Sequence, residues 1–361
     1  MINVFEPGVI GDEAFAAGNT ILSRWLGAGK RANEFESAWA AHIETDAANV
    51  VSLHNCTEAL FQAVALLTNP GDTVIVPAIH FIGVGNAVLA QGRRLELCDV
   101  DPHTLNVHSL SLGYRCDAII LNHYGGIPCD FASIRQHNKH ATIIEDAACA
   151  PASTYHDQPA GTLGDCGIWS FDAMKVLTTG DGGMAWLRDP EDAARLRRQT
   201  RLGLEVKHGS QRQDERWWEF DVPEECGRLS EMNDVAASIG LAQLKRLPEL
   251  VERRRQVCAM YDEGLSGLDW LTLRPRCQDD RTDSYYFYWV QCERRDELAQ
   301  FLRLNNVYTT FRYWPLHWAY GLGGSYPGAE QAALTTLLLP CHPNLTDADV
   351  DKIIALVRRF K

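Results

Sequence analysis

The sequence predicts an α/β protein with two parts, a large domain built on a mainly parallel sheet and a smaller C-terminal α+β domain. Two patterns and the chain length lead to this fold class. Short strand-like segments alternate with helix-like segments over the first half of the chain, and the strand-like segments are almost continuously apolar. Strands of this kind are typical of a parallel sheet that helices cover on both faces. With 361 residues, the chain is also long enough for two domains and a large core.

The expected elements follow one another in a regular order. Residues 1–45 are expected to be largely helical, with a polar break at 27–30. The segments expected after them are strand 49–53, helix 58–67, strand 73–77, helix 83–91, and strands 94–98, 118–121 and 141–145. The last third of the chain is expected to contain a long helix over 241–261, a strand over 285–290 and a final helix over 347–360. A boundary near 245 divides the chain into a large domain, 1–245, and a small domain, 246–361.

Composition and charge argue against several classes of partner. Hydrophobic residues make up 46% and charged residues 22% of the chain, as in an ordinary soluble globular protein. The net charge of −13 argues against non-specific nucleic-acid binding, which needs a basic surface. No apolar run approaches the roughly 20 residues that span a bilayer, and the acidic residues 1–13 lack the features of a signal peptide. We therefore expect a cytoplasmic protein with neither nucleic-acid nor membrane partners.

Several common site motifs are missing. The eleven cysteines, spread from Cys56 to Cys341, show no metal-ligand spacing, so we expect mostly buried free thiols and no metal site. No GxGxxG follows a predicted strand, and neither a P-loop nor a serine nucleophile elbow is present.

The ends of the predicted strands provide the first candidate site residues, because ligands of parallel sheets bind at the carboxyl ends of the strands. Asn55, Cys56 and Thr57 follow the first strand and directly precede a helix. The free backbone N–H groups of a helix start bind phosphate well, and Thr57 adds a hydroxyl. N-capping by Asn55 or Thr57 is the alternative, and for this segment alone it is the better explanation.

Lys175 lies in an apolar, strand-like segment just before the glycine-rich turn 180–183. A lysine that is partly removed from water has a lowered pKa and can form a Schiff base. Ser170, five positions earlier, is a candidate phosphate ligand. The alternative is a surface lysine whose stem packs on apolar side chains while the amine stays in water. For an arbitrary lysine this alternative is the better explanation, and the scarcity of charge and the many glycines around Lys175 weaken it.

Glu145 and Asp146 place two carboxylates at the end of a buried strand. A buried carboxylate is costly unless a cation or a proton donor meets it. In enzymes that use pyridoxal phosphate (PLP), an aspartate pairs with the pyridinium nitrogen, so that the ring can act as an electron sink. A structural carboxylate that caps neighbouring loops explains the pair equally well.

Together these motifs resemble the DegT/DnrJ/EryC1/StrS family of nucleotide-sugar aminotransferases, which are fold-type-I PLP enzymes. The resemblance runs nearly from end to end, from residue 25 to the last helix. The segments that carry it are Glu145-Asp146-Ala147-Ala148, Ser170-Phe171 followed by Lys175, residues 178–183, 232–234 with 240–244, 99–101 with 104–106, and 123–128.

The resemblance implies a role for each matched residue. Lys175 would bind the cofactor as a Schiff base and move protons, and Asp146 would meet the pyridine nitrogen. Phe81 occupies the place of an aromatic residue stacked on the cofactor ring. Residues near the cofactor phosphate would be Cys56, Thr57 and Ser170. His317, in a small-domain loop with Pro315 and Leu316, would lie near the sugar, and each active site would be shared between the two subunits of a homodimer.

The sequence departs from the family pattern in three places. Cys149 stands where the family often has His or Gln near the phenolic oxygen of the cofactor, and a thiol is a poor hydrogen-bond partner. Leu229 stands where many members have an asparagine that reaches the phosphate of the neighbouring subunit, so neighbouring Arg228 is the candidate substitute. His54-Asn55 replaces a small polar pair.

The expected activity is transfer of an amino group from an amino acid, with glutamate as the expected donor, to a keto group of a nucleotide-linked deoxysugar. Arg312 is a candidate contact for the diphosphate of such a substrate, and a solvated surface arginine explains it equally well. Two other functions remain open on the same fold. A PLP-dependent sugar dehydratase is one, although relatives of that type carry His in place of the Schiff-base lysine. A non-catalytic cofactor-binding protein is the other, motivated by Cys149 and Leu229.

Overall fold

A seven-stranded sheet forms the centre of the larger part of the molecule. The computed structural model describes residues 1–107, 112, 116–204, 218–219 and 226–360. The strands lie in the order β1-β9-β8-β5-β4-β2-β3. Their bounds are β1 (Val50–Leu53), β2 (Thr73–Pro77), β3 (Arg94–Cys98), β4 (Ala118–Asn122), β5 (Thr142–Asp146), β8 (Cys166–Ser170) and β9 (Gly183–Leu187). All pairings from β3 to β8 are parallel, and β9 runs antiparallel to both of its neighbours.

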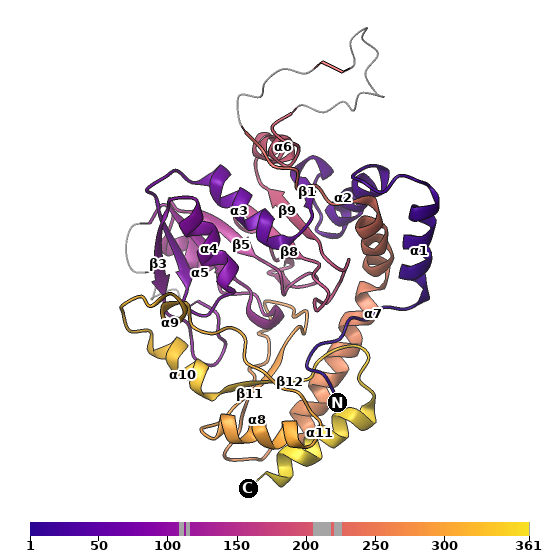
Figure 1. Ribbon diagram of the computed structural model, residues 1–361. Helices are drawn as coiled ribbons and strands as arrows, with labels where there is room; N and C mark the ends of the chain where they lie inside the picture. Colours follow the sequence, from indigo (N-terminus) through magenta and orange to yellow (C-terminus); the bar gives the residue numbers. More distant parts are fainter. Residues whose placement is uncertain (108–111, 113–115, 205–217, 220–225, 361) are drawn as a thin grey trace.

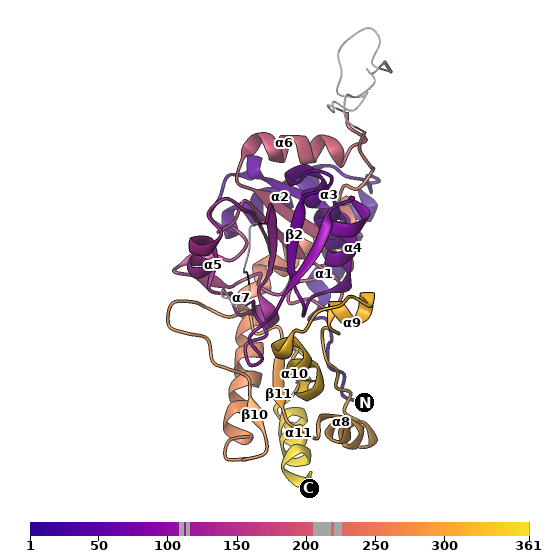
Figure 2. The same cartoon turned by 90° about the vertical axis from the view of Figure 1, so that its left-hand side faces the viewer.

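Helices cover both faces of this sheet. One face packs on α3 (Cys56–Leu67), α4 (Ile82–Ala90) and α6 (Pro190–Gln199) in a single apolar cluster. The other face packs on α2 (Lys30–His42), α5 (Phe131–His137) and the first half of α7 (Asp234–Gly264), and α1 (Gly11–Leu22) lies against α7. Figure 2 shows α4 and α5 on opposite sides of β2. The predicted fold class, a mainly parallel sheet covered on both faces, is confirmed.

A smaller antiparallel sheet lies at the other end of α7 (Figure 1). Its strands are β10 (Thr272–Leu273), β11 (Tyr288–Gln291) and β12 (Thr336–Leu339), and the helices of this part are α8 (Arg295–Leu304), α9 (Leu316–Tyr320), α10 (Pro327–Thr335) and α11 (Asp347–Arg359). The remaining short elements are η1 (Ala47–Asn49), η3 (Tyr124–Gly126), β6 (Thr154–Tyr155) and β7 (Gln158–Pro159). The second half of α7 packs into the core of this smaller part.

Helix α7 is continuous through residue 245 and contains Pro248. The domain boundary near 245 therefore falls inside a helix, and the division of the chain into 1–245 and 246–361 stays a prediction. The helix also begins seven residues before the predicted start at 241, because the Asn233 side chain accepts a hydrogen bond from the Ala236 N–H at 2.9 Å and caps the helix there.

Two segments differ from the prediction for reasons that involve distant residues. The strand expected over 285–290 begins only at Tyr288. Tyr285 has a φ of 53°, and the N–H groups of Tyr286 and Phe287 both donate to the carbonyl of Gly125 instead of to a neighbouring strand. Lys175 lies in the loop between β8 and β9 rather than in a strand-like segment.

None of the described helices is long and apolar enough to cross a membrane. All eleven cysteines are free thiols. Within the part of the chain that the structure describes, no group of three or more His, Cys, Asp and Glu side chains is placed to hold a metal ion.

Glu145 is fully buried and holds a loop against the sheet. Its carboxylate accepts hydrogen bonds from the N–H groups of Gly161 (2.9 Å), Leu163 (2.7 Å) and Gly164 (2.6 Å). His123 Nε2 lies 2.9 Å from Oε2 of the same carboxylate. Because neighbouring strand residues face opposite sides of the sheet, Asp146 lies on the other face. Glu145 is therefore the loop-capping carboxylate.

We expect Glu145→Gln to lower the free energy of unfolding by about 3 kcal/mol, because an amide places an N–H group against backbone donors in a fully buried site. Urea titration followed by circular dichroism measures the change. The control is Lys30→Gln, which removes an exposed 3.7 Å ion pair with Glu34 and should leave the unfolding curve almost unchanged. Coincident curves for Glu145→Gln and the unmodified chain would contradict the role of Glu145.

Candidate active site

A cavity of about 470 Å³ opens at the carboxyl ends of the central strands. A segment of the smaller part, with Arg312 and Tyr313, forms one of its walls. The residues that line the cavity are Asn55, Cys56, Thr57, Glu58, Leu60, Phe61, His80, Phe81, Asn122, Asp146, Ala148, Cys149, Ser170, Asp172, Lys175, Asp181, Gly182, Arg228, Arg312 and Tyr313. Every predicted site residue except His317 is among them.

The start of α3 is capped by Asn55, and this cap does not use all of its free backbone donors. The Asn55 side chain caps the helix by accepting a hydrogen bond from the Glu58 N–H at 2.7 Å. The N–H groups of Cys56 and Thr57 precede the first intrahelical bond, and the structure gives them no partner among the described residues. Gly183 lets this helix start approach the sheet, since a Cβ there would lie 2.5 Å from Asn55 backbone. Capping by Asn55 thus leaves two donors free for an anion.

Asp146 is the carboxylate that faces the cavity. It is 6% exposed, and Oδ1 accepts a hydrogen bond from the Ala148 N–H at 2.9 Å. Oδ2 lies 3.9 Å from Nε2 of His80, and no shorter ion pair of Asp146 occurs among the described residues. Asp146 therefore keeps the capacity to accept a further hydrogen bond from a ligand in the cavity.

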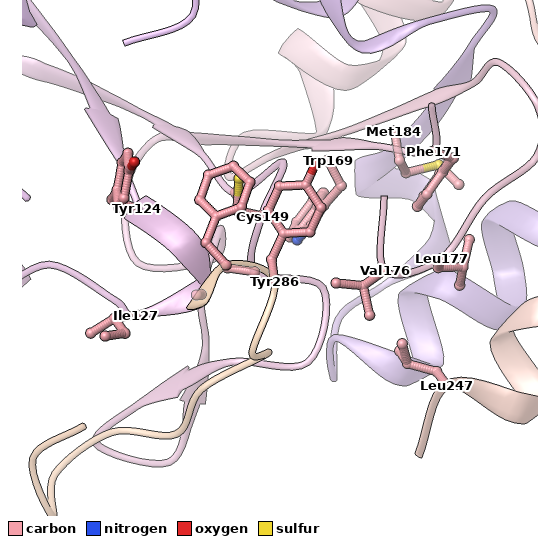
Figure 3. Packing of buried hydrophobic residues seen from close by; sticks show 14 of the residues in the cluster. Tyr124, Ile127, Cys149, Trp169, Phe171, Val176, Leu177, Met184, Leu247 and Tyr286 are labelled. Atoms are coloured by element: carbon pink, nitrogen blue, oxygen red, sulfur yellow. The ribbon is translucent and has the colours of Figure 1, made fainter. Parts of the chain in front are cut away.

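Lys175 is held in place by its loop and faces groups from two distant segments. Its N–H donates to the Asp172 carbonyl at 3.0 Å. Its Nζ lies 3.9 Å from Cys149 Sγ and 4.8 Å from the centroid of the Tyr286 ring. Figure 3 shows Cys149 and Tyr286 in the same buried cluster as Val176, the residue after the lysine. Packing of these neighbours fixes the position from which the amine can react.

The pKa of Lys175 departs from its usual value in the direction opposite to that predicted. Burial by itself lowers the pKa, but Cys149, the Tyr286 and Tyr313 phenols and Asp146 outweigh burial and raise the pKa of Lys175 well above its usual range. The expectation of a lowered pKa is therefore wrong for the chain without a ligand. Its free amine is an ammonium at neutral pH and has to release a proton before it can bind a carbonyl carbon.

Cys149 is buried beside this ammonium. Burial, with Asp146 as a smaller contribution, raises the pKa of the Cys149 thiol, although Lys175 and Arg312 act in the opposite direction. A cysteine side chain is a weak hydrogen-bonding group beside Lys175.

Phe81 and Arg312 stand at the open side of the cavity. Phe81 is 40% exposed, and its ring meets the Tyr313 ring edge-on with 5.9 Å between centroids. The Arg312 guanidinium lies over the Phe5 ring, 4.6 Å from its centroid, and the Tyr124 hydroxyl donates to the Arg312 carbonyl. In the described part of the chain, no carboxylate lies within 4.0 Å of the Arg312 guanidinium, so this cation remains available to an anionic ligand.

His317 is buried away from the lining of the cavity. Its Nε2 lies 3.4 Å from Glu330 Oε1, and its ring packs on that of Tyr326 with 4.7 Å between centroids. Burial lowers the pKa of His317. Neither of its ring nitrogen atoms has a hydrogen-bond partner among the described residues. Because His317 lies outside the lining, its assignment as a sugar contact stays a prediction that this cavity does not support.

Arg228 and Leu229 occupy different surroundings. Leu229 is 72% exposed and does not line the cavity. Arg228 does line it, and its Nη1 lies 3.0 Å from Oε2 of Glu58 in the first turn of α3. Arg228 thus adds a positive charge near the two free N–H groups of the helix start.

Sequence reasoning missed four lining or neighbouring residues: His80, Asn122, Tyr286 and Tyr313. Asn122 and His80 lie at or just after strand ends, so the rule that found Asp146 could have found them. The two tyrosines come from the smaller part, and no local signal in the sequence connects them with Lys175.

Comparison with known proteins agrees with this arrangement. A model of the DegT/DnrJ/EryC1/StrS aminotransferase family matches residues 10–358. The dTDP-4-dehydro-2,3,6-trideoxy-D-glucose 4-aminotransferase of Saccharopolyspora spinosa is 42% identical over 363 residues, which cover 97% of this chain and 94% of that relative. The structure of the aminotransferase TlmJ from Streptoalloteichus hindustanus is 48% identical, with a TM-score of 0.93 over 99% of this chain and 98% of that chain. Spr1654 from Streptococcus pneumoniae, in its PMP form, is 26% identical, with a TM-score of 0.91 over 99% and 98% of the two chains. The chain therefore belongs to the DegT/DnrJ/EryC1/StrS aminotransferase family.

Proposed function

We propose that this PLP-dependent aminotransferase moves an amino group from an amino acid, with glutamate as donor, to a keto group of a nucleotide-linked deoxysugar. The observation that carries the proposal is the single cavity in which Lys175, Asp146 and the start of α3 meet. The relative from S. spinosa, which acts on a dTDP-linked keto-deoxysugar according to its name, supports this class of acceptor.

The residues of the cavity fit PLP. Two backbone N–H groups at the start of α3, with the Thr57 hydroxyl and Ser170 close by, form a cradle for a phosphate. The Asp146 carboxylate suits a protonated pyridine nitrogen, and the exposed face of Phe81 suits an aromatic ring. Cys149 lies beside Lys175, in the region assigned to the phenolic oxygen.

When bound, PLP supplies a carbonyl that takes up the amino group and an electron-withdrawing ring that eases removal of a proton from the neighbouring carbon. Lys175 would attach the cofactor through Nζ and, once released, move a proton at the reacting carbon as a general acid and base. Asp146 would keep the ring nitrogen protonated. The Tyr286 and Tyr313 side chains would limit access of water to the amine.

Arg312 is the proposed contact for the anionic part of a substrate. Its guanidinium lines the cavity and forms no ion pair with a carboxylate among the described residues. A planar guanidinium suits phosphate and carboxylate oxygens equally well.

The dehydratase alternative gains no support, since the position at which such relatives carry His is occupied by Lys175 in the cavity.

A homodimer is the proposed assembly. The N-terminal helix α1 and the residues just after it expose large apolar side chains, namely Phe15, Ile21, Leu22, Trp25 and Leu26. An apolar surface of this extent supports burial against a second copy of the chain.

We also propose a cytoplasmic location, which the mostly buried free thiols support.

We expect Lys175→Ala to abolish covalent attachment of the cofactor, because Lys175 is the only lysine among the described residues that line the cavity. Borohydride reduction followed by peptide mass spectrometry should find PLP on the peptide with residue 175 in the unmodified protein and no adduct in the variant. Lys139→Ala, at an exposed position, is the control and should keep the adduct. A Lys175→Ala protein that still carries PLP covalently would refute the assignment.

We expect Arg228→Gln to weaken binding of PLP about fivefold and to leave binding of pyridoxal, which has no phosphate, unchanged. Fluorescence titration of both aldehydes measures the difference, and Arg228→Lys, which keeps the charge, should lose less. An equal loss for PLP and pyridoxal would show that Arg228 does not contact the phosphate.

The activity is tested with glutamate and a set of nucleotide-linked keto-deoxysugars that differ in nucleotide and in the position of the keto group. Mass spectrometry should find one acceptor in which the keto oxygen has been replaced by an amino group, together with 2-oxoglutarate. Amination of free amino-acid keto analogues but of no nucleotide sugar would contradict the proposed acceptor class.

A further inference from the structure

His80 carries a buried nitrogen atom that lacks a hydrogen-bond partner. The residue lies between β2 and α4, is 1% exposed and lines the cavity. Its Nδ1 accepts a hydrogen bond from the Phe81 N–H at 2.9 Å. An imidazole nitrogen that accepts an N–H carries no proton, so the proton of a neutral His80 is on Nε2. That Nε2 makes no hydrogen bond of good geometry among the described residues, and the Leu121 carbonyl is the backbone acceptor that approaches it.

The orphan Nε2 faces the carboxylate that is proposed to meet the cofactor. The distance from Nε2 to Asp146 Oδ2 is 3.9 Å, whereas Oδ1 is already satisfied by the Ala148 N–H. Buried donors without a partner are uncommon and destabilising, so a role in a ligand-bound state is a physical reason for retaining one. Hydrogen bonds of an active site are often long in the absence of the ligand.

His80 is neutral rather than a cationic partner of Asp146. Burial lowers the pKa of His80, and this effect outweighs the opposite effects of Asp146 and the Leu121 carbonyl, while Lys175 adds to the lowering. The three elements packed against the imidazole thus contribute one carboxylate, one carbonyl and one ammonium. A neutral imidazole can donate to the carboxylate without competing for its proton.

We propose that His80 is a positioning residue, whose Nε2–H orients Asp146 Oδ2 so that the carboxylate stays ionised and aligned with the ring nitrogen of PLP. The inference rests on the proposed function, because it concerns the partner of the cofactor ring. The same side chain anchors the start of α4 through Nδ1, which connects the position of Asp146 with that of Phe81, the residue proposed to lie against the ring.

Two substitutions separate the two nitrogen atoms of His80. In His80→Asn the amide oxygen takes the place of Nδ1 and can still accept the Phe81 N–H, but no donor reaches Asp146. In His80→Gln the amide nitrogen takes the place of Nε2 and keeps a donor toward Asp146. Circular dichroism of both variants establishes that they are folded before cofactor is added.

The measurements are the dissociation constant of PLP and the ¹⁵N NMR shift of PLP labelled at the ring nitrogen. We expect His80→Asn to bind PLP about tenfold more weakly, with the nitrogen resonance displaced toward that of unprotonated pyridine. We expect the PLP affinity of His80→Gln to stay within about threefold of that of the unmodified protein, with an unchanged nitrogen resonance.

Two results would overturn the inference while leaving the proposed function intact. One is PLP affinity and nitrogen shift in His80→Asn that equal those of the unmodified protein. The other is an equal loss of affinity in both variants with an unchanged nitrogen shift. That result would show that His80 acts only by accepting the hydrogen bond from the Phe81 N–H. Failure of the unmodified protein to bind PLP would instead refute the proposed function and this inference with it.

Discussion

The burial of two neighbouring carboxylates at the end of β5 is the constraint on which the site depends. Strand geometry sends Glu145 and Asp146 to opposite faces of the sheet, so their charges are met in different ways. Glu145 is satisfied within the protein by three backbone N–H groups and His123, which holds the following loop against the strand. Asp146 accepts one hydrogen bond from a backbone N–H, and His80 Nε2 lies 3.9 Å from its carboxylate. One carboxylate therefore fastens a loop to the sheet, and the other remains free to meet a ligand in the cavity.

Local pattern and strand-end position identified part of this cavity, because both depend on residues close together in the sequence. The apolar strands predicted the sheet, and the residues after them included Cys56, Thr57 and Asp146, whereas Phe81 and Cys149 were found through the family resemblance. The sequence could not decide whether Glu145 or Asp146 faces the cavity. Side chains alternate between the two faces of a sheet, but this alternation does not say which face carries the cavity. At the start of α3 the two competing interpretations turned out to be compatible, because an Asn55 cap satisfies only one of the N–H groups in the first turn.

What sequence could not predict depends on contacts between distant segments. The aromatic run 285–290 has the composition of a strand, yet the carbonyl of Gly125 takes two of its N–H groups and turns Tyr286 toward Lys175. Contacts between distant segments also decide the direction in which the pKa of Lys175 is shifted. Burial alone would lower this pKa, and the neighbours that raise it come from three other segments. The reactivity of the amine is thus a property of how the smaller part packs on the larger one.

Helix α7 connects the two parts of the molecule. Its first half lies in the core beside the large sheet and its second half in the core beside the small sheet, so one continuous rod joins the two parts. This rod lacks one backbone hydrogen bond at Pro248, where the missing N–H leaves the carbonyl of Leu244 without its helical partner. The connection between the two cores is therefore a helix with one weakened turn, and that turn lies outside the cavity.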